Sequence, residues 1–129
     1  MKLTRTFSPH PWMALTLAGL LGLSAPAWAQ LRVGMPSGFT GSVAAGVKEN
    51  HEGAKLYFDT INARGGVNGQ KIELITVDDK FDPKVTVEVA RELITKQKVL
   101  ALFLNRGTPH TQALLPLLAE LKVPLVGPS

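Results

Sequence analysis

The sequence predicts an α/β fold, a doubly wound parallel sheet, from two observations. Four short segments rich in apolar and β-branched residues alternate along the chain with three longer segments of helical periodicity. Such alternation builds βαβ units, in which right-handed helical crossovers join parallel strands. The 129 residues are enough for one domain of this kind. We expect the flavodoxin-like strand order 2-1-3-4, which brings the loops after the first and third strands to the switch point of the sheet.

The first strand is predicted over residues 31–35, and a loop rich in Gly, Ser and Thr follows over residues 36–41. A loop at the carboxyl end of a parallel strand commonly contacts ligand. Ser37 and Gly38 are therefore candidate ligand-binding residues, and a plain turn is the alternative. The first helix is predicted over residues 42–63, where apolar residues recur at spacings of three and four.

The second strand and helix are set off by turn residues. The first helix is expected to end near Gly65, because glycine adopts the left-handed conformation without a steric cost. Residues 71–77 alternate in polarity and contain β-branched side chains, which predicts a strand. Asp82 followed by Pro83 is the pattern of an N-cap and a first helical residue, so the second helix is expected over residues 83–96.

The third strand is predicted from the continuous apolar run of residues 98–104, which is typical of a parallel strand buried on both faces. Thr108 is expected to cap the third helix, predicted over residues 109–121. Pro116 removes a backbone hydrogen bond and should kink or shorten that helix. Residues 123–126 predict the fourth strand.

The start of the third helix is a predicted anion site. The free N–H groups and the partial positive charge of ~0.5 e at a helix N-terminus suit a carboxylate. Arg106 lies just before this helix and supplies a guanidinium able to bind both oxygens of a carboxylate.

A longer motif indicates a family. The string N-A-R-G-G-V-N-G-Q-K-I-E-L, followed by V-D-D-K-F-D-P, resembles the type I periplasmic solute-binding proteins of ABC importers, in particular their leucine/isoleucine/valine-binding branch. The resemblance covers roughly residues 31–129. It implies two lobes that close on a ligand, with residues 30–129 as the N-terminal part of lobe 1, and hence a truncated product or a partial gene model.

The resemblance also implies a function and a site. The function is capture of a small amino acid, or a related carboxylate or amide, and its delivery to a membrane permease, without a chemical reaction and without a cofactor. The ligand-binding positions carried over from the family lie mainly in the loops after the third and fourth strands. They are Arg106, Gly107, Thr108 and Ser129, with Ser37 and Gly38 from the first loop.

Two departures from the family pattern argue against a simple leucine-type ligand. Relatives in that branch place an aromatic residue over the ligand after the first strand, where this chain has the small residues Ala44, Ala45 and Gly46. Arg106 is also larger and more charged than the small polar residues common at its position.

Residues 1–29 predict a secretory signal peptide, and a periplasmic location follows from it. Lys2 and Arg5 give a positive start, and the apolar stretch over residues 12–23 is shorter than the ~20 residues of a spanning helix. A small-x-small motif ends at Ala29, so cleavage is expected after Ala29. The sequence has no cysteine, which excludes a disulfide framework and a lipid-modified cysteine after the leader.

The charge does not favour nucleic acid as a partner. The formal net charge is +4, but Lys2 and Arg5 belong to the predicted leader. The remainder carries 12 basic and 10 acidic residues, a net charge of +2. These charges are interspersed and form no basic stripe of the kind that phosphate backbones select.

The acidic cluster of Asp78, Asp79 and Asp82 has two interpretations. Clustered carboxylates suit Mg²⁺ or Ca²⁺, and a phospho-receiver domain also gathers acids at strand ends. However, a receiver's acid pair follows its first strand, and here the pair follows the second. The favoured interpretation is that Asp82 caps a helix while Asp78 and Asp79 bond to loop N–H groups. We expect no metal site.

Two other function classes remain open. An exported flavodoxin-like enzyme would need a phosphate loop or an activated nucleophile, but G-x-x-x-x-G-K-[ST] and G-x-S-x-G are both absent. His51 and His110 also have no Ser or Cys elbow partner. A sensory ligand-binding domain of a receptor uses the same fold, and a transmembrane segment further along the chain would distinguish it.

Overall fold

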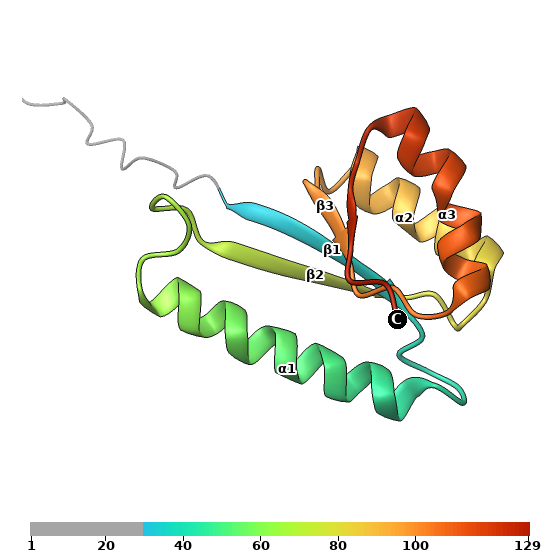
Figure 1. The fold of residues 1–129 in the computed structure, drawn as a ribbon, viewed down its shortest axis with the longest axis horizontal. Helices are drawn as coiled ribbons and strands as arrows, with labels where there is room; N and C mark the ends of the chain where they lie inside the picture. Colours follow the sequence, from blue (N-terminus) through green and yellow to red (C-terminus); the bar gives the residue numbers. More distant parts are fainter. Residues whose placement is uncertain (1–29) are drawn as a thin grey trace, which may run out of the picture.

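The computed structural model describes residues 30–129 and shows strands alternating with helices (Figure 1). The predicted signal peptide and its cleavage site after Ala29 lie outside the described residues. In chain order, the elements are β1 (Leu31–Ser37), α1 (Ala44–Ala63), β2 (Ile72–Asp78), α2 (Pro83–Thr95), β3 (Ala101–Phe103), α3 (Thr108–Leu121) and β4 (Leu125–Val126).

The strands form one parallel sheet in the order β2-β1-β3-β4. β1 pairs with β2 along its whole length, from Leu31 opposite Ile72 to Ser37 opposite Asp78. On its other side, β1 pairs with β3, with Gly34 opposite Leu102. The predicted doubly wound α/β fold and its strand order are confirmed. All strand carboxyl ends meet at one edge, which we call the carboxyl edge; its loops are residues 38–43, 79–82, 104–107 and 127–129.

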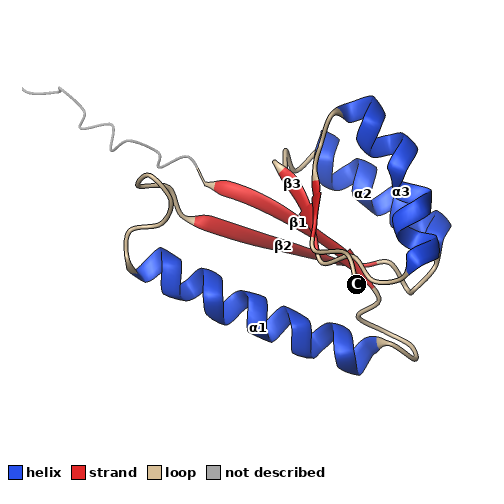
Figure 2. Cartoon of the chain, in the orientation of Figure 1, coloured by secondary structure: helices blue, strands red, loops and turns tan. Residues whose placement is uncertain are grey.

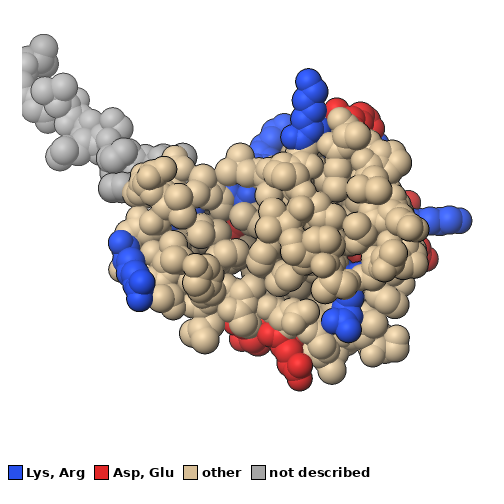
Figure 3. Space-filling model, viewed as in Figure 1, with Lys and Arg blue, Asp and Glu red and all other residues tan. Residues whose placement is uncertain are grey.

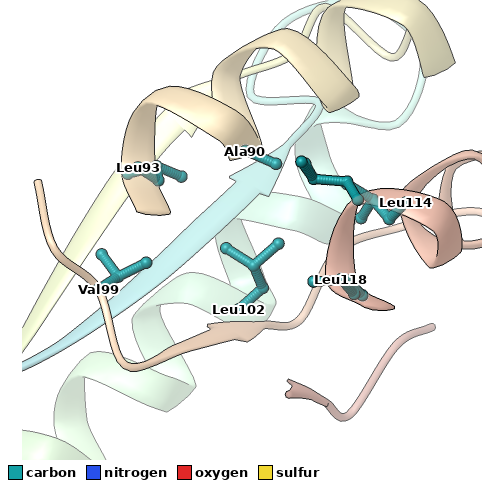
Figure 4. Packing of buried hydrophobic residues seen from close by; sticks show 7 residues of the cluster. Ala90, Leu93, Val99, Leu102, Leu114 and Leu118 are labelled. Atoms are coloured by element: carbon teal, nitrogen blue, oxygen red, sulfur yellow. The ribbon is translucent and has the colours of Figure 1, made fainter. Parts of the chain in front are cut away.

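The helices cover the sheet unequally (Figure 2): α1 lies on one side of the sheet, and α2 and α3 lie together on the other. The main core is on the α2–α3 side (Figure 4). Gly34 allows these layers to approach closely, because a Cβ there would lie 3.1 Å from Leu93 Cδ1 and 3.2 Å from Leu102 Cδ2. The buried members of this core are Ala90, Leu93, Val99, Leu102, Leu114, Leu117 and Leu118.

The α1 side is less completely covered. Met35 and Val47 are buried there, and Phe58 contacts Phe103 with a centroid distance of 5.5 Å. Tyr57, in contrast, is 65% exposed, so it is a flanking and not a core residue. Leu100 is 57% exposed, and the prediction that residues 98–104 are buried on both faces is wrong at this position.

β3 is shorter than predicted because left-handed residues bracket it. Lys98 has a φ of 58° and Leu104 a φ of 50°, values that interrupt extended backbone. Leu100 N–H still donates to Arg32 O at 2.8 Å, so the chain joins the sheet before the regular strand begins.

The helix starts confirm one prediction and correct another. Asp82 caps α2, since its side chain accepts a hydrogen bond from Lys84 N–H at 2.8 Å. Thr108 is the first residue of α3 and not its cap; the cap is Gly107, with a φ of 100°. Pro116 does not shorten α3, which continues to Leu121.

Charges of both signs are mixed on the face of the molecule shown in Figure 3. On the face shown in Figure 3, lysine and arginine side chains are scattered and acidic side chains lie among them. Within residues 30–129, no helix is long and apolar enough to cross a membrane.

Candidate ligand site at the carboxyl edge

Asp78 joins the loops after β1 and β2. Its Oδ2 accepts a hydrogen bond from the Thr40 hydroxyl at 2.7 Å, and its Oδ1 accepts from Lys80 N–H at 3.0 Å. Partial burial raises the pKa of Asp78, but bonds from the Thr40 hydroxyl and from the N–H groups of Lys80, Thr40 and Phe39 outweigh burial. The pKa therefore lies below its ordinary value. Asp78 is a structural carboxylate in this loop.

Asp79 is fully buried, and its carboxylate accepts hydrogen bonds from the same loop and from α2. Its Oδ1 accepts from Phe81 N–H at 2.9 Å, and its Oδ2 accepts from the Thr86 hydroxyl at 2.7 Å. These bonds hold Lys80 and Phe81 in left-handed backbone, each with a φ of 55°. The predicted loop-bonding roles of Asp78 and Asp79 are confirmed. Within residues 30–129, no three His, Asp or Glu side chains gather closely enough to hold a metal ion.

Phe81 contacts the loops that follow three different strands. It belongs to the loop after β2, and its Cβ lies 3.1 Å from where a Cβ at Gly38, after β1, would be. Its ring atom Cε2 lies 3.2 Å from the Cβ position at Gly107, after β3. The ring stacks on His110 in α3, with a centroid distance of 4.4 Å and an interplanar angle of 22°. Phe81 therefore lies at the β1–β3 switch point, and it remains 36% exposed.

Buried polar atoms without partners gather beside this stack. His110 is only 3% exposed, and neither of its ring nitrogens has a hydrogen-bond partner among the described residues. Asn105 is fully buried; its Nδ2 donates to Thr111 Oγ1 at 3.1 Å, while its Oδ1 has no partner in the described part. Buried polar groups without partners are uncommon and are a known feature of functional sites.

Gly107 must be a glycine at this point of the chain. Its φ of 100° is strained for other residues, and a Cβ would lie 2.6 Å from His110 Nδ1. His110 thus points at the residue that caps α3, and its ring fills the space that a side chain would need.

The predicted residues of the third and fourth loops lie together. Gly107 N–H donates to Ser129 O at 2.6 Å, and Ser129 N–H donates to Asn105 O at 3.0 Å. Arg106, Gly107, Thr108 and Ser129 are therefore neighbours at the carboxyl edge. Thr108 and Ser129 are exposed there.

The predicted residues of the first loop share this edge but lie inside it. Ser37 is fully buried, and its hydroxyl is directed to Leu104 O at 3.5 Å. Gly38 is buried between Val43 and Phe81, since a Cβ there would lie 2.8 Å from Val43 Cγ2. These two residues support the loops after β2 and β3.

Arg106 extends over the start of α1. Its Nη1 lies 3.3 Å from the position that a Cβ at Gly46 would take. Among the described residues, no carboxylate forms a salt bridge with this guanidinium. The small residues Ala44, Ala45 and Gly46 thus leave room for an arginine that has no acidic partner.

Hollows elsewhere on the chain do not include these loops. One of about 420 Å³ lies between α2 and α3, beside Val87 and Ala113. Another of about 430 Å³ lies at the opposite, amino end of the sheet, beside Gln30 and Gly69. The carboxyl edge is distinguished by its unpartnered polar groups.

Comparison with known proteins identifies the family. The family model described as "Periplasmic binding protein" matches residues 30–129. This chain belongs to the periplasmic binding protein family. An "Amino acid binding protein" of Pseudomonas aeruginosa is 37% identical over 89 residues, which are 69% of this chain and 24% of that protein.

Solved structures agree with the fold. A substrate-binding periplasmic protein of Ralstonia solanacearum superposes with a TM-score of 0.74 at 36% identity, covering 77% of this chain and 29% of that one. The branched-chain amino acid binding protein LivJ of Streptococcus pneumoniae, in complex with isoleucine, gives a TM-score of 0.71 at 31% identity, covering 75% and 28%. The chain spans about a quarter of the length of the relatives it matches.

Sequence reasoning did not single out Phe81, His110 or Asn105 as residues of this site. A lone aromatic side chain in an acidic turn was the available signal for Phe81. The signal for His110 was its place three residues after the glycine that caps α3. Neither pattern reveals that the two rings stack.

Proposed function

We propose that this chain is part of the substrate-binding component of an ABC importer and captures a small amino acid or a related carboxylate or amide. The observation that carries the proposal is the Arg106 guanidinium, which has no acidic partner among residues 30–129. It lies beside the first turn of α3, at the edge where the loops after β1, β3 and β4 meet. Ligands of open parallel sheets bind at this edge. The named relatives include amino acid binding proteins, which supports the ligand class.

The carboxylate subsite consists of Arg106 and the start of α3. In the first turn, Thr111 N–H already donates to Gly107 O at 3.0 Å, and proline has no N–H to offer. The N–H groups of Thr108 and His110 are those that a helix leaves without an internal partner. They suit a carboxylate, and the Thr108 hydroxyl and the Arg106 guanidinium add charge-assisted contacts to the same group.

Membership of the family supports a wider arrangement. Residues 30–129 contribute part of the first lobe, and capture occurs when a second lobe closes over the carboxyl edge. Residues 1–29 act as a secretory signal peptide cleaved after Ala29, and the protein works in the periplasm. The loaded protein delivers its ligand to a membrane permease and catalyses no reaction. Neighbouring permease and ATPase genes would support the importer role; a transmembrane segment further along the gene product would favour a receptor's sensory domain.

Calorimetric titration of the protein expressed from its full gene tests the proposal. A panel of amino acids, their amides and simple carboxylates should contain at least one ligand that binds at micromolar concentration. Arg106→Gln should lower the affinity for that ligand by roughly 10- to 100-fold, which corresponds to the loss of one charge-assisted contact. Arg64→Gln is the matched control, because Arg64 is an exposed arginine at the opposite edge of the sheet.

The outcomes separate cleanly. Equal affinity in Arg106→Gln and the parent protein would remove Arg106 from the site. Failure of every panel member to bind, in a protein whose circular dichroism shows a cooperative thermal transition, would overturn the proposed ligand class.

A further inference from the structure

We propose that Phe81 is the specificity-determining residue of this site and that the preferred ligand is an aromatic carboxylate, with its ring against Phe81 and its carboxylate at Arg106 and Thr108. The inference rests on the proposed function and names the ligand class of that same site. It has four independent parts: the place of Phe81, its backbone, its support by His110, and the charges around it.

Phe81 lies at the part of the sheet edge where ligands bind in folds of this kind. Its Cβ is 3.1 Å from the Cβ position at Gly38, and its ring atom Cε2 is 3.2 Å from that at Gly107. These two glycines follow β1 and β3, the strands at which the order of the sheet reverses. In doubly wound sheets, the crevice outside this reversal is where ligands bind. Phe81 is therefore next to the residues that cap α3.

The backbone of Phe81 is held in a conformation that phenylalanine rarely adopts. Lys80 and Phe81 both have a φ of 55°, a region unfavourable for bulky residues. The buried carboxylate of Asp79 secures this turn by accepting from Phe81 N–H at 2.9 Å. Strained backbone that is fixed by its surroundings is concentrated at ligand-binding positions. The result here is an aromatic ring that lies over the switch point and stays 36% exposed.

His110 supports the ring from behind. The two rings stack at a centroid distance of 4.4 Å and an angle of 22°, which occupies one face of the phenyl group. His110 is 3% exposed, and neither ring nitrogen has a partner among the described residues, so its ring meets Phe81 through packing. Phe81 still keeps 36% of its surface exposed, and this part is available to a ligand.

The basic side chains at this edge suit a carboxylate. Of the acids at this edge, Asp78 accepts from Thr40 and Lys80, Asp79 from Phe81 and Thr86, and Asp82 from Lys84. All three are thus committed to holding the loop. Within the described residues, two basic side chains of this edge, Arg106 and Lys80, form no salt bridge with a carboxylate. A planar apolar anion matches a phenyl face beside a guanidinium.

The test compares three ligands on the protein expressed from its full gene by calorimetry. Benzoate is planar, cyclohexanecarboxylate has the same charge and nearly the same size but is not planar, and leucine adds an ammonium group. We expect benzoate to bind about tenfold more tightly than cyclohexanecarboxylate, the difference expected for one aromatic stacking contact.

Variants assign the preference to Phe81. Phe81→Leu should abolish the tenfold difference, and Phe81→Tyr, which keeps the ring, should retain it. Tyr57→Leu is the control, because Tyr57 is an exposed aromatic residue on α1, away from the carboxyl edge; it should leave all three affinities within about twofold. Should Phe81→Leu fail to fold, Phe81→Met, which also lacks the ring, takes its place in the comparison.

Each outcome has one meaning. Leucine binding without benzoate binding would overturn the aromatic ligand class while leaving the proposed function intact. A benzoate preference that survives Phe81→Leu would overturn the role of Phe81. If no carboxylate or amino acid binds the parent protein, the proposed function and this inference both fail.

Discussion

Two asparagines show how differently the ends of this sheet are organised. Asn62, at the end of α1, donates from Nδ2 to Ile72 O at 2.8 Å and accepts from Ile72 N–H at 2.7 Å. Both functions of its amide are used, and they fix the start of β2 against the helix. Asn105, after β3, is fully buried, yet its Oδ1 has no partner among the described residues.

Neighbouring polar groups show the same contrast between the two ends of the sheet. At the amino end, Val67 and Gln70 exchange hydrogen bonds of 2.8 and 2.9 Å, which closes the turn between α1 and β2. At the carboxyl edge, His110 adds two more unpartnered nitrogens within the described part. An unpartnered buried group costs more than a hydrogen bond contributes. Among residues 30–129 such groups occur at the carboxyl edge alone, which is what the proposed ligand site predicts.

The largest effect is expected at the amino end, from Gly66→Ala. Gly66 has a φ of 76°, and a Cβ there would overlap the carbonyl group of Gln70, so the turn must shift. We expect the free energy of unfolding to fall by about 3 kcal/mol, measured by urea denaturation. Gly53→Ala, where a Cβ would have open space within α1, should instead gain about 1 kcal/mol. Equal effects of the two substitutions would show that this turn is not the constraint we describe.

A smaller effect distinguishes the asparagines directly. Asn62→Leu removes both bonds to Ile72 and should lower the free energy of unfolding by about 2 kcal/mol. Asn105→Leu, which is nearly isosteric, loses only the 3.1 Å bond to Thr111 and also removes an unpartnered oxygen. We expect it to cost less than ~1 kcal/mol. The two urea midpoints compare them, and the reverse ranking would contradict the division between the edges.

The smallest expected effect is the acid dependence that Asp78 contributes. Its pKa is lower in the folded protein than the ordinary value of 3.8, so the folded state binds fewer protons than the unfolded one. The stabilisation is present above about pH 4 and is lost as the pH falls through the folded pKa. Solvent screening keeps it below ~1 kcal/mol. Urea midpoints at pH 7, 4 and 3 should fall less in Asp78→Asn than in the parent protein; parallel curves would exclude this role.

The strand order was predictable because local signals mark almost every boundary. Gly65 ends α1, and Asp82 with Pro83 begins α2, each for a backbone reason that does not depend on the rest of the fold. The apolar run before Asn105 located β3 but overestimated its length, because hydrophobicity does not reveal the left-handed turn at Lys98. It also cannot show that Leu100 is left exposed.

The site was predictable only in part. Arg106 and Thr108 could be placed at the carboxyl edge because every strand of a parallel sheet ends there. The contact of Phe81 with His110 joins a loop residue to a residue of α3, and only the folded chain brings them together. The cap of α3 was misassigned by one residue. The capping position is occupied by Gly107, with a φ of 100°, and Thr108 is the first residue of the helix.

The bond between Thr40 and Asp78 has a consequence for engineering. Oδ2 of Asp78 accepts a hydrogen bond from the Thr40 hydroxyl at 2.7 Å, although 38 positions separate these two residues. The conformations of the loops after β1 and β2 therefore depend on each other. A chimera that imports the first loop from a relative should import the second with it. In an alignment of close homologues, these two positions should change together.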